Sequence, residues 1–170
     1  REACDTSHGT SAYSLISMAR HGLPLLSAEG GVADRQPGDP SAGMAYSSIV
    51  ALSYLGASRA VPNYNVMGPS KASLEAIVRG LALELGPDPH CVRVNAVSAG
   101  PINTMAARGI RGFTDMRNDA AERSMLQRNI EAQEVAEVVS FLAGEQSSGV
   151  TGQTIFVDGG YSSIAGPPRS

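Results

Sequence analysis

The sequence predicts an α/β fold built on a doubly wound parallel sheet. Two observations predict it. Short apolar runs suited to buried strands alternate with longer segments that have helical periodicity. Each connection between consecutive strand candidates is also long enough to hold a helix, which a parallel pair of strands requires. We expect a single partial domain over residues 1–170.

The N-terminal segment has the apolar pattern of an amphipathic helix. Thr6 and Ser7 are suitable cap residues, and the pattern after them predicts a helix to about Arg20. Gly22 and Pro24 are expected to end this helix. The apolar residues that recur at helical spacing are Ala12, Leu15, Ile16 and Ala19.

Residues 27–46 are rich in Gly, Pro, Asp, Ser and Ala and have no periodicity, so we predict an exposed loop insertion. Strands are predicted at 48–53, 92–98 and 154–157, because each is a short run of β formers bounded by loop residues.

Helices are predicted between these strands. Residues 64–85 carry one apolar stripe and end at Gly86 and Pro87, residues 133–143 carry a second stripe, and residues 106–128 have weaker helical signals. The two stripes consist of Leu74, Ile77, Val78, Leu81 and Leu85, and of Val135, Val138, Val139 and Leu142.

Composition argues against several classes of function. A net charge of -3 provides no electrostatic footprint for nucleic acid. No apolar run is long enough to cross a bilayer and no export signal is present, so we expect a cytoplasmic protein without a membrane partner. Cys4 and Cys91 lack ligand spacing, which predicts reduced thiols and no metal site.

Polar residues follow two of the predicted strands, at the sheet edge where parallel α/β folds bind ligands. Tyr54 comes directly after the first strand, and Tyr64 and Lys71 lie two turns apart on one face of the predicted helix. An ammonium there is expected to lower the pKa of a nearby phenol and improve it as a donor to an oxyanion. Gly100 and Pro101 follow the next strand. Singly these residues suit packing or a solvated surface, but together they predict a catalytic site.

Three runs carry a resemblance to a known family: SIVALSYLGASRAVPNYNVMGPSKASLEAIVR, VRVNAVSAGPINTMAARGI and VTGQTIFVDGG. With the opening REACDTSHGTSAYSLISMA, they resemble the C-terminal portion of the bacterial type of enoyl-acyl-carrier-protein reductase, a divergent short-chain dehydrogenase/reductase. Met67 stands where ordinary members of that superfamily have tyrosine, and the wide spacing from Tyr64 to Lys71 separates enoyl reductases from ketone reductases. The resemblance covers nearly all of the chain apart from 27–46. It implies a Rossmann-like sheet that lacks its N-terminal cofactor-binding half.

The resemblance also implies an activity and the residues that carry it. The enzyme would reduce trans-2-enoyl thioesters to saturated thioesters in fatty-acid elongation, by hydride transfer from NADH or NADPH. Tyr64 would hydrogen-bond the thioester carbonyl, Lys71 would hold the nicotinamide ribose hydroxyls, and Tyr54 would donate a proton or orient the substrate. Residues 104–130 would form a lid over the acyl chain. The other implied cofactor contacts are Gly100, Pro101, Ile102, Asn103, Thr104, Met105 and Ala106. The other implied substrate contacts are Met67, Ile110, Phe113 and Met116.

The family also implies partners and an assembly. We expect NADH rather than NADPH as cofactor, a substrate bound to acyl-carrier protein or coenzyme A, and a homotetramer. No glycine-rich turn precedes Tyr54, so we expect the isolated chain to bind cofactor weakly or not at all. Arg1 in place of an initiator Met indicates a fragment or a processed chain.

Two alternatives stay open. A ketone or 3-oxoacyl reductase of the same superfamily would use Ser53 at the strand end, although Met67 argues against it. The chain is alternatively a non-catalytic fragment whose helices near 12–19 and 74–85 pair with copies of themselves.

Overall fold

The computed structural model describes residues 1–26, 47–87, 89–105, 107 and 111–166. Its sheet has three parallel strands in the order β1-β2-β3, with β1 at Ser47–Tyr54, β2 at Val92–Ala99 and β3 at Thr154–Val157. The three predicted strands are confirmed to within one residue at each end. The apolar runs that form them are bounded by loop residues, which leaves each run no room for a helix.

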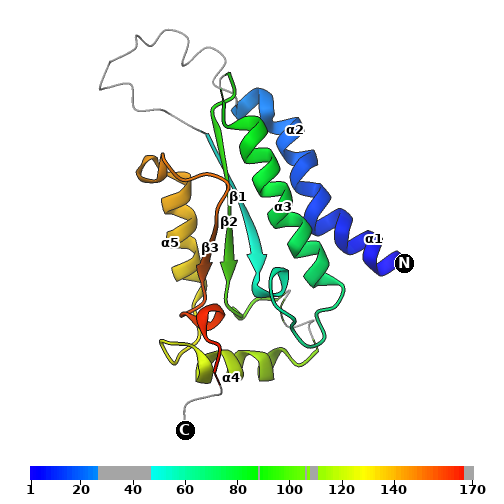
Figure 1. The fold of residues 1–170 in the computed structure, drawn as a ribbon, viewed down its shortest axis with the longest axis vertical. Helices are drawn as coiled ribbons and strands as arrows, with labels where there is room; N and C mark the ends of the chain where they lie inside the picture. Colours follow the sequence, from blue (N-terminus) through cyan, green and yellow to red (C-terminus); the bar gives the residue numbers. More distant parts are fainter. Residues whose placement is uncertain (27–46, 88, 106, 108–110, 167–170) are drawn as a thin grey trace.

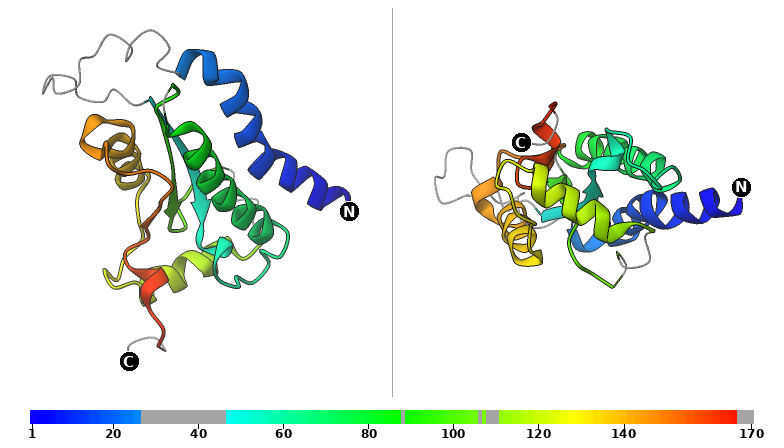
Figure 2. Two further views of the ribbon diagram at one scale, coloured as in Figure 1. Left: turned by 45° about the horizontal axis from the view of Figure 1, so that its top comes forward. Right: turned by 90° about the horizontal axis from the view of Figure 1, so that it is seen from below.

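Helices cover both faces of the sheet and one of its ends, which confirms a doubly wound α/β fold (Figure 1). The N-terminal helix and α3 lie on one face, and α5 lies on the other. Helix α4 crosses the end toward which the strand arrows point, as the view from below shows (Figure 2). The later helices are α3 at Met67–Leu85, α4 at Phe113–Arg123 and α5 at Ala132–Ala143.

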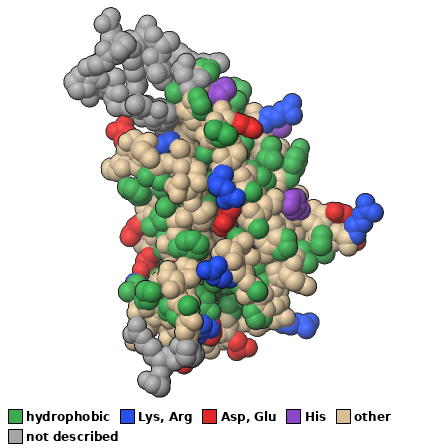
Figure 3. Space-filling view, viewed as in Figure 1, with side chains coloured by type: hydrophobic (Ala, Val, Ile, Leu, Met, Phe, Trp, Pro, Cys, Tyr) green, Lys and Arg blue, Asp and Glu red, His purple; other side chains and the backbone are tan. Residues whose placement is uncertain are grey.

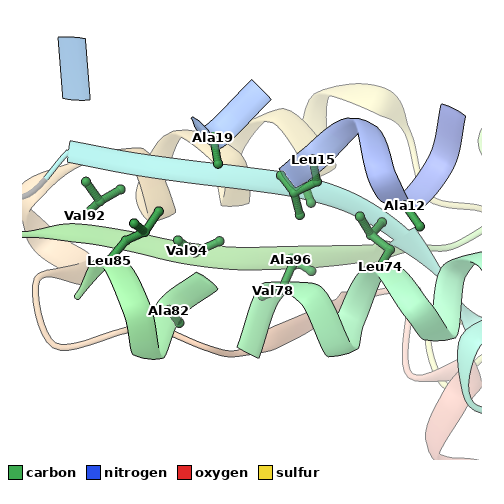
Figure 4. Close-up of a cluster of buried hydrophobic side chains, with 11 residues drawn as sticks. Ala12, Leu15, Ala19, Leu74, Val78, Ala82, Leu85, Val92, Val94 and Ala96 are labelled. Atoms are coloured by element: carbon green, nitrogen blue, oxygen red, sulfur yellow. The ribbon is translucent and has the colours of Figure 1, made fainter. Parts of the chain in front are cut away.

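The central strand β2 separates two apolar clusters. Val92, Val94 and Ala96 alternate along the strand and face α2 (Ser14–Leu26) and α3 in the larger cluster (Figure 4). Val97 points the other way and packs with α5 in the smaller cluster. All three helical faces predicted from periodicity pack into these clusters, but Ile16 of the first face does not: it is 37% exposed, so its prediction as part of that face was wrong. The residues involved are Ala12, Leu15, Ala19, Leu74, Ile77, Val78, Leu81 and Leu85 in the first cluster, and Val135, Val138, Val139 and Leu142 in the second.

The N-terminal helix is longer than predicted and changes type inside. It runs as α1 at Glu2–His8, a π-helical segment at Gly9–Tyr13, and α2 at Ser14–Leu26. The prediction of an end near Arg20 was therefore wrong. Leu23 and Leu26 pack against the larger core cluster, and this contact holds the last turn in helical form although Pro24 lies within it.

Helix α3 begins later than predicted, and this changes the expected geometry of the site. It starts at Met67, so Tyr64 lies in the preceding turn and not on a helical face shared with Lys71. Asn63 has a left-handed backbone, with φ of 60°, which prevents a helix from extending back through this turn. Pro69 falls in the first helical turn, where its missing N–H costs little.

Two other predicted segments differ in extent. The weak signals over 106–128 correspond to α4, which is shorter, and the expected insertion at 27–46 lies outside the described residues. Helix α5 begins with a capping box in which Glu131 and Glu134 each bind a backbone N–H of the first turn. None of the helices in the described part of the chain is long and apolar enough to span a membrane. Acidic and basic side chains are interspersed on the face shown in Figure 3.

Arg93 is a buried cation, only 3% exposed, that joins β2 to the end of α5. Its guanidinium donates to the carbonyls of Leu142 at 2.9 Å and Gly144 at 3.0 Å, and to the hydroxyl of Ser147 at 2.8 Å. Burial lowers the pKa of Arg93. The carbonyl oxygens thus stabilise the buried positive charge, as a carboxylate does in most proteins.

Arg93→Ala is expected to lower the free energy of unfolding by about 3 kcal/mol, because it removes hydrogen bonds donated by a buried charged group and leaves the space of its side chain empty. Urea unfolding followed by circular dichroism measures the change. Arg79→Ala, at an exposed position of α3, is the control and is expected to change stability by no more than about 0.5 kcal/mol. Equal stability of the two variants would contradict this role for Arg93.

Candidate active site

A cavity of about 500 Å³ opens at the carboxyl ends of β1 and β2, where this class of sheet binds ligands. It gathers residues from the ends of both strands, the turn before α3, α3 itself and α4. The predicted site residues among its lining are Tyr54, Tyr64, Met67, Lys71, Gly100, Pro101, Ile102, Thr104, Phe113 and Met116; Leu52, Ser53, Ala99, Ala107 and Val135 complete it.

The two tyrosines of the cavity contact each other edge to face. Their ring centroids are 5.0 Å apart with an interplanar angle of 66°. Tyr54 is the last residue of β1, and Tyr64 is held in the turn before α3, where its carbonyl accepts a 2.8 Å bond from the Gly68 amide. The tertiary fold, and not a shared helical face, therefore brings Tyr64 and Lys71 to one cavity.

Two glycines that no sequence pattern singles out allow the close packing around Tyr64: Gly56 leaves room for its ring, and Gly68 leaves room for the Gly56 carbonyl. A Cβ at Gly56 would lie 2.4 Å from Cδ1 of Tyr64, and one at Gly68 would lie 3.0 Å from the Gly56 carbonyl oxygen. Either substitution forces the ring or the turn to move. The sequence offers one signal for the role of Gly56: it is a glycine two residues after the catalytic candidate Tyr54.

The Tyr54 hydroxyl points toward α4, where it donates to the Met116 sulfur at 3.0 Å. Burial, followed by the nearby Tyr64, Tyr161 and Asp119, raises the pKa of Tyr54 to about 12. Burial also raises the pKa of Tyr64. The expectation that an ammonium lowers a phenol pKa here was therefore wrong, because burial is the main cause of both shifts and raises both pKa values. Both phenols are neutral hydrogen-bond donors at neutral pH.

Lys71 points from the first turns of α3 toward the end of β1. Its Nζ donates to the carbonyl of Leu52 at 2.8 Å, and an ammonium has three N–H donors, so a ligand hydroxyl can be bound in addition. Burial lowers the pKa of Lys71, and the Glu75 carboxylate opposes this shift. Glu75 itself accepts a 2.5 Å bond from the Ser53 hydroxyl.

Lys71 is the only lysine of the chain, so its titration can be followed without interference. With ¹³Cε-labelled lysine, we expect a single NMR signal whose midpoint lies below that of the urea-unfolded chain, and Glu75→Gln to lower the midpoint further. The folded chain then binds this proton less tightly than the unfolded chain. Stability should accordingly rise with pH between the folded pKa and the ordinary lysine value. A midpoint equal to that of the unfolded chain would contradict the burial of Lys71.

Not every predicted site residue reaches this cavity. The Met105 side chain is 88% exposed, and Asn103 lines a separate hollow with the start of α4. Ala106 and Ile110 lie outside the described residues. In the described part of the chain, no cluster of three or more His, Cys, Asp or Glu side chains could hold a metal ion.

A polar cluster that was not predicted from the sequence holds the second half of α4 in place. The Tyr161 hydroxyl donates to Asp119 at 2.5 Å, Arg123 lies 3.7 Å from the same carboxyl group, and its guanidinium lies 5.6 Å from the centre of the Tyr161 ring. The Leu126 amide also donates to the Gly159 carbonyl. These contacts tie α4 to the segment that follows β3. A second cavity of about 510 Å³ lies beside this cluster and shares Tyr54 and Met116 with the first.

The fold and the cavity define a class: a doubly wound α/β protein with a paired-tyrosine and lysine site at the carboxyl ends of its strands. Residues 1–162 match the family described as Enoyl-(Acyl carrier protein) reductase. The chain belongs to this family. This confirms the resemblance read from the sequence.

Individual relatives agree with this membership. The enoyl-acyl-carrier-protein reductase (NADH) FabI of Neisseria meningitidis is 45% identical over 162 residues, which are 95% of this chain and 55% of the relative. The enoyl-acyl-carrier-protein reductase (NADPH) FabI of Staphylococcus aureus MRSA252 is 45% identical over 164 residues, which are 96% of this chain and 57% of the relative.

A solved structure agrees as well. The enoyl-acyl-carrier-protein reductase of Bacillus cereus, crystallised with NADP⁺ and indole naphthyridinone, superposes with a TM-score of 0.82 at 39% identity, covering 97% of this chain and 57% of that one. The chain thus spans a little over half the length of these relatives and corresponds to their C-terminal portion.

Proposed function

We propose that this chain supplies the catalytic residues of an enoyl-acyl-carrier-protein reductase, which reduces trans-2-enoyl thioesters to saturated thioesters with a nicotinamide cofactor. One observation carries the proposal. Tyr54, Tyr64 and Lys71, from three different segments, line one cavity at the carboxyl ends of the strands. The matching names of the relatives support the reaction.

Tyr64 is the proposed donor to the thioester carbonyl. When the β carbon of the enoyl group accepts hydride, negative charge develops on that oxygen, and a neutral phenol positioned in advance stabilises it. Its raised pKa suits this part, because the group stays protonated at neutral pH. Tyr54 is the proposed second donor or orienting group. Its bond to Met116 places its hydroxyl between the cavity and α4.

The residues present fit a nicotinamide nucleotide. Lys71 has donors for the ribose hydroxyls, and Gly100, Pro101, Ile102 and Thr104 line the cavity beside it. The cofactor, when bound, supplies the hydride. Asn103, Met105 and Ala106 are proposed to contact it as well. We propose NADH as the cofactor, as in the name of the Neisseria relative. The Staphylococcus relative is named for NADPH, so the experiment compares the two cofactors.

The acyl chain is proposed to lie along the apolar side of the cavity, formed by Met67, Phe113 and Met116. Ile110, which lies outside the described residues, is proposed as a further contact by the family resemblance. Residues 104–130 are proposed to act as its lid, which excludes water during the reaction. The thioester carrier would be acyl-carrier protein or coenzyme A.

A cytoplasmic homo-oligomer, a tetramer by the family resemblance, is also proposed. The observation that supports an oligomer is a set of large apolar side chains left exposed on α2 and α3: Met18 is 72% exposed, Leu25 91% and Leu83 79%. Light scattering after size exclusion tests the assembly. A stable oligomer without turnover would favour the alternative of a non-catalytic interaction module.

The experiment fuses this chain to the N-terminal part of the Neisseria relative, which the chain does not cover, and follows oxidation of NADH or NADPH with crotonyl and acetoacetyl thioesters. We expect reduction of the crotonyl thioester. Turnover of only the acetoacetyl thioester would instead show a ketone reductase. The 170-residue chain is also measured without the fusion partner. Calorimetry is expected to detect weak or no cofactor binding to it.

A further inference from the structure

Met67, which lines the apolar side of the cavity, has a hydroxyl of another helix beside its sulfur. Oγ of Ser7 in α1 lies within hydrogen-bond distance of the Met67 sulfur, at 3.1 Å, and 2.8 Å from Oγ of Ser70. Ser70 is only 2% exposed and lies 3.2 Å from the Val66 carbonyl oxygen. These groups join α1 to the first turn of α3, next to the residues that line the catalytic cavity.

The π-helical segment explains how Ser7 reaches this position. A π-helix closes its hydrogen bonds over five residues rather than four, so residues five apart come into line. Ser7 therefore lines up with the fully buried Ala12, five residues later, and faces α3 together with it. In an uninterrupted α-helix the buried face defined by Ala12 would continue back to His8, which is exposed here.

The network has two arrangements, because each hydroxyl has one hydrogen and the Ser7 and Ser70 oxygens, 2.8 Å apart, need a hydrogen between them. In the first, Ser70 donates to Ser7 and Ser7 donates to Met67. In the second, Ser7 donates to Ser70 and Ser70 donates to the Val66 carbonyl, and Met67 keeps only van der Waals contact with Ser7. Only the first arrangement gives the thioether a donor. Ser70 fixes the position of the Ser7 oxygen in both.

We propose that Ser7 is a positioning residue that holds the Met67 side chain in one rotamer against the cavity, and thereby sets how the acyl chain of the substrate fits. A methionine has three rotatable side-chain bonds and fills irregular space, so its shape is otherwise adaptable. A donor on its sulfur removes part of that freedom. The acyl part of this proposal rests on the proposed enoyl reductase function, whereas the positioning of Met67 does not.

The chain provides a matched control. Ser73 Oγ lies 3.2 Å from the His8 ring nitrogen Nε2, so it is another serine of α3 in a hydrogen bond to α1, but Met67 is not part of this bond. Ser73→Ala therefore removes an α1 to α3 contact of the same kind without changing the surroundings of the thioether. Ser7→Thr keeps the hydroxyl and serves as the conservative variant.

The first experiment uses the 170-residue chain labelled with ¹³C at its six methionine methyl groups, with the Met67 signal assigned by its loss in Met67→Leu. Ser7→Ala is expected to shift or broaden that signal, and Ser7→Thr and Ser73→Ala to leave it in place. An unchanged signal in Ser7→Ala would overturn the proposal. So would an equal change in Ser73→Ala, because it would show general loosening of α1.

The second experiment uses the fusion with the Neisseria segment and a series of enoyl thioesters of increasing length. Ser7→Ala is expected to raise KM about three- to tenfold for acyl chains long enough to reach Met67, the factor that one hydrogen bond represents. The value of kcat should stay unchanged. Ser73→Ala should match the parent. A shifted Met67 signal with an unaltered KM series would overturn the acyl part. A parent fusion without enoyl reduction would refute the proposed function, while the NMR comparison would still decide the positioning.

Discussion

Tyr64→Phe is expected to lower kcat for enoyl thioester reduction by about 10²- to 10³-fold, the usual cost of removing one donor from a developing oxyanion. The variant keeps the ring, so the edge contact with Tyr54 and the space provided by Gly56 are retained. KM should change little, since the lost interaction strengthens only in the transition state. The measurement is NADH oxidation by the fusion protein at saturating substrate.

Tyr13→Phe is the control for this prediction, because Tyr13 is 61% exposed and lies outside the cavity. Its kcat should equal that of the parent. If Tyr64→Phe kept more than about a tenth of the parent kcat, the phenol would not be the oxyanion donor that we propose.

Lys71→Met is expected to raise KM for the nicotinamide cofactor by about 10- to 100-fold, the factor that a hydrogen bond to a charged group represents. Methionine keeps an apolar stem of similar length and loses only the ammonium. Lys71→Arg should recover little, because a planar guanidinium cannot take the place of a compact ammonium beside the Leu52 carbonyl. Cofactor titrations of the fusion protein measure the change.

Arg59→Ala removes one positive charge from the exposed loop after β1 and controls for a general electrostatic effect. We expect it to leave the cofactor KM unchanged. Equal effects of the Arg59 and Lys71 variants would mean that the cofactor responds to net charge and not to a bond from Lys71.

Regular elements were predictable because their signals are local. The strand runs and the apolar stripes of α3 and α5 appear in the sequence at the right positions, since burial on one face leaves a period that can be counted. The N-terminal helix shows the limit. Its π-helical segment and its passage through Pro24 depend on packing against the core, and no local preference indicates either.

The site, too, was predictable in part. Residue type and family resemblance single out Tyr54, Tyr64 and Lys71, and the structure brings all three to one cavity. Their arrangement could not be predicted, because Tyr64 lies before α3 and burial raises the pKa of both phenols. Gly56 and the contact from Ser7 to Met67 depend on segments that only the fold brings together.

If α4 moves as part of the proposed lid over residues 104–130, the contacts of Tyr161 with Asp119 and Arg123 restrict how it can move. A helix fixed near its C-terminal end can swing but cannot slide, so displacement should grow toward Phe113 and be smallest at Arg123. Gly112, which precedes the helix with φ of 75°, tolerates a conformation that other residues rarely adopt. Substrate would then enter past the N-terminal end of α4, which moves, while the C-terminal end stays in place. A spin label at the start of α4 would report a wider range of distances than one at its end.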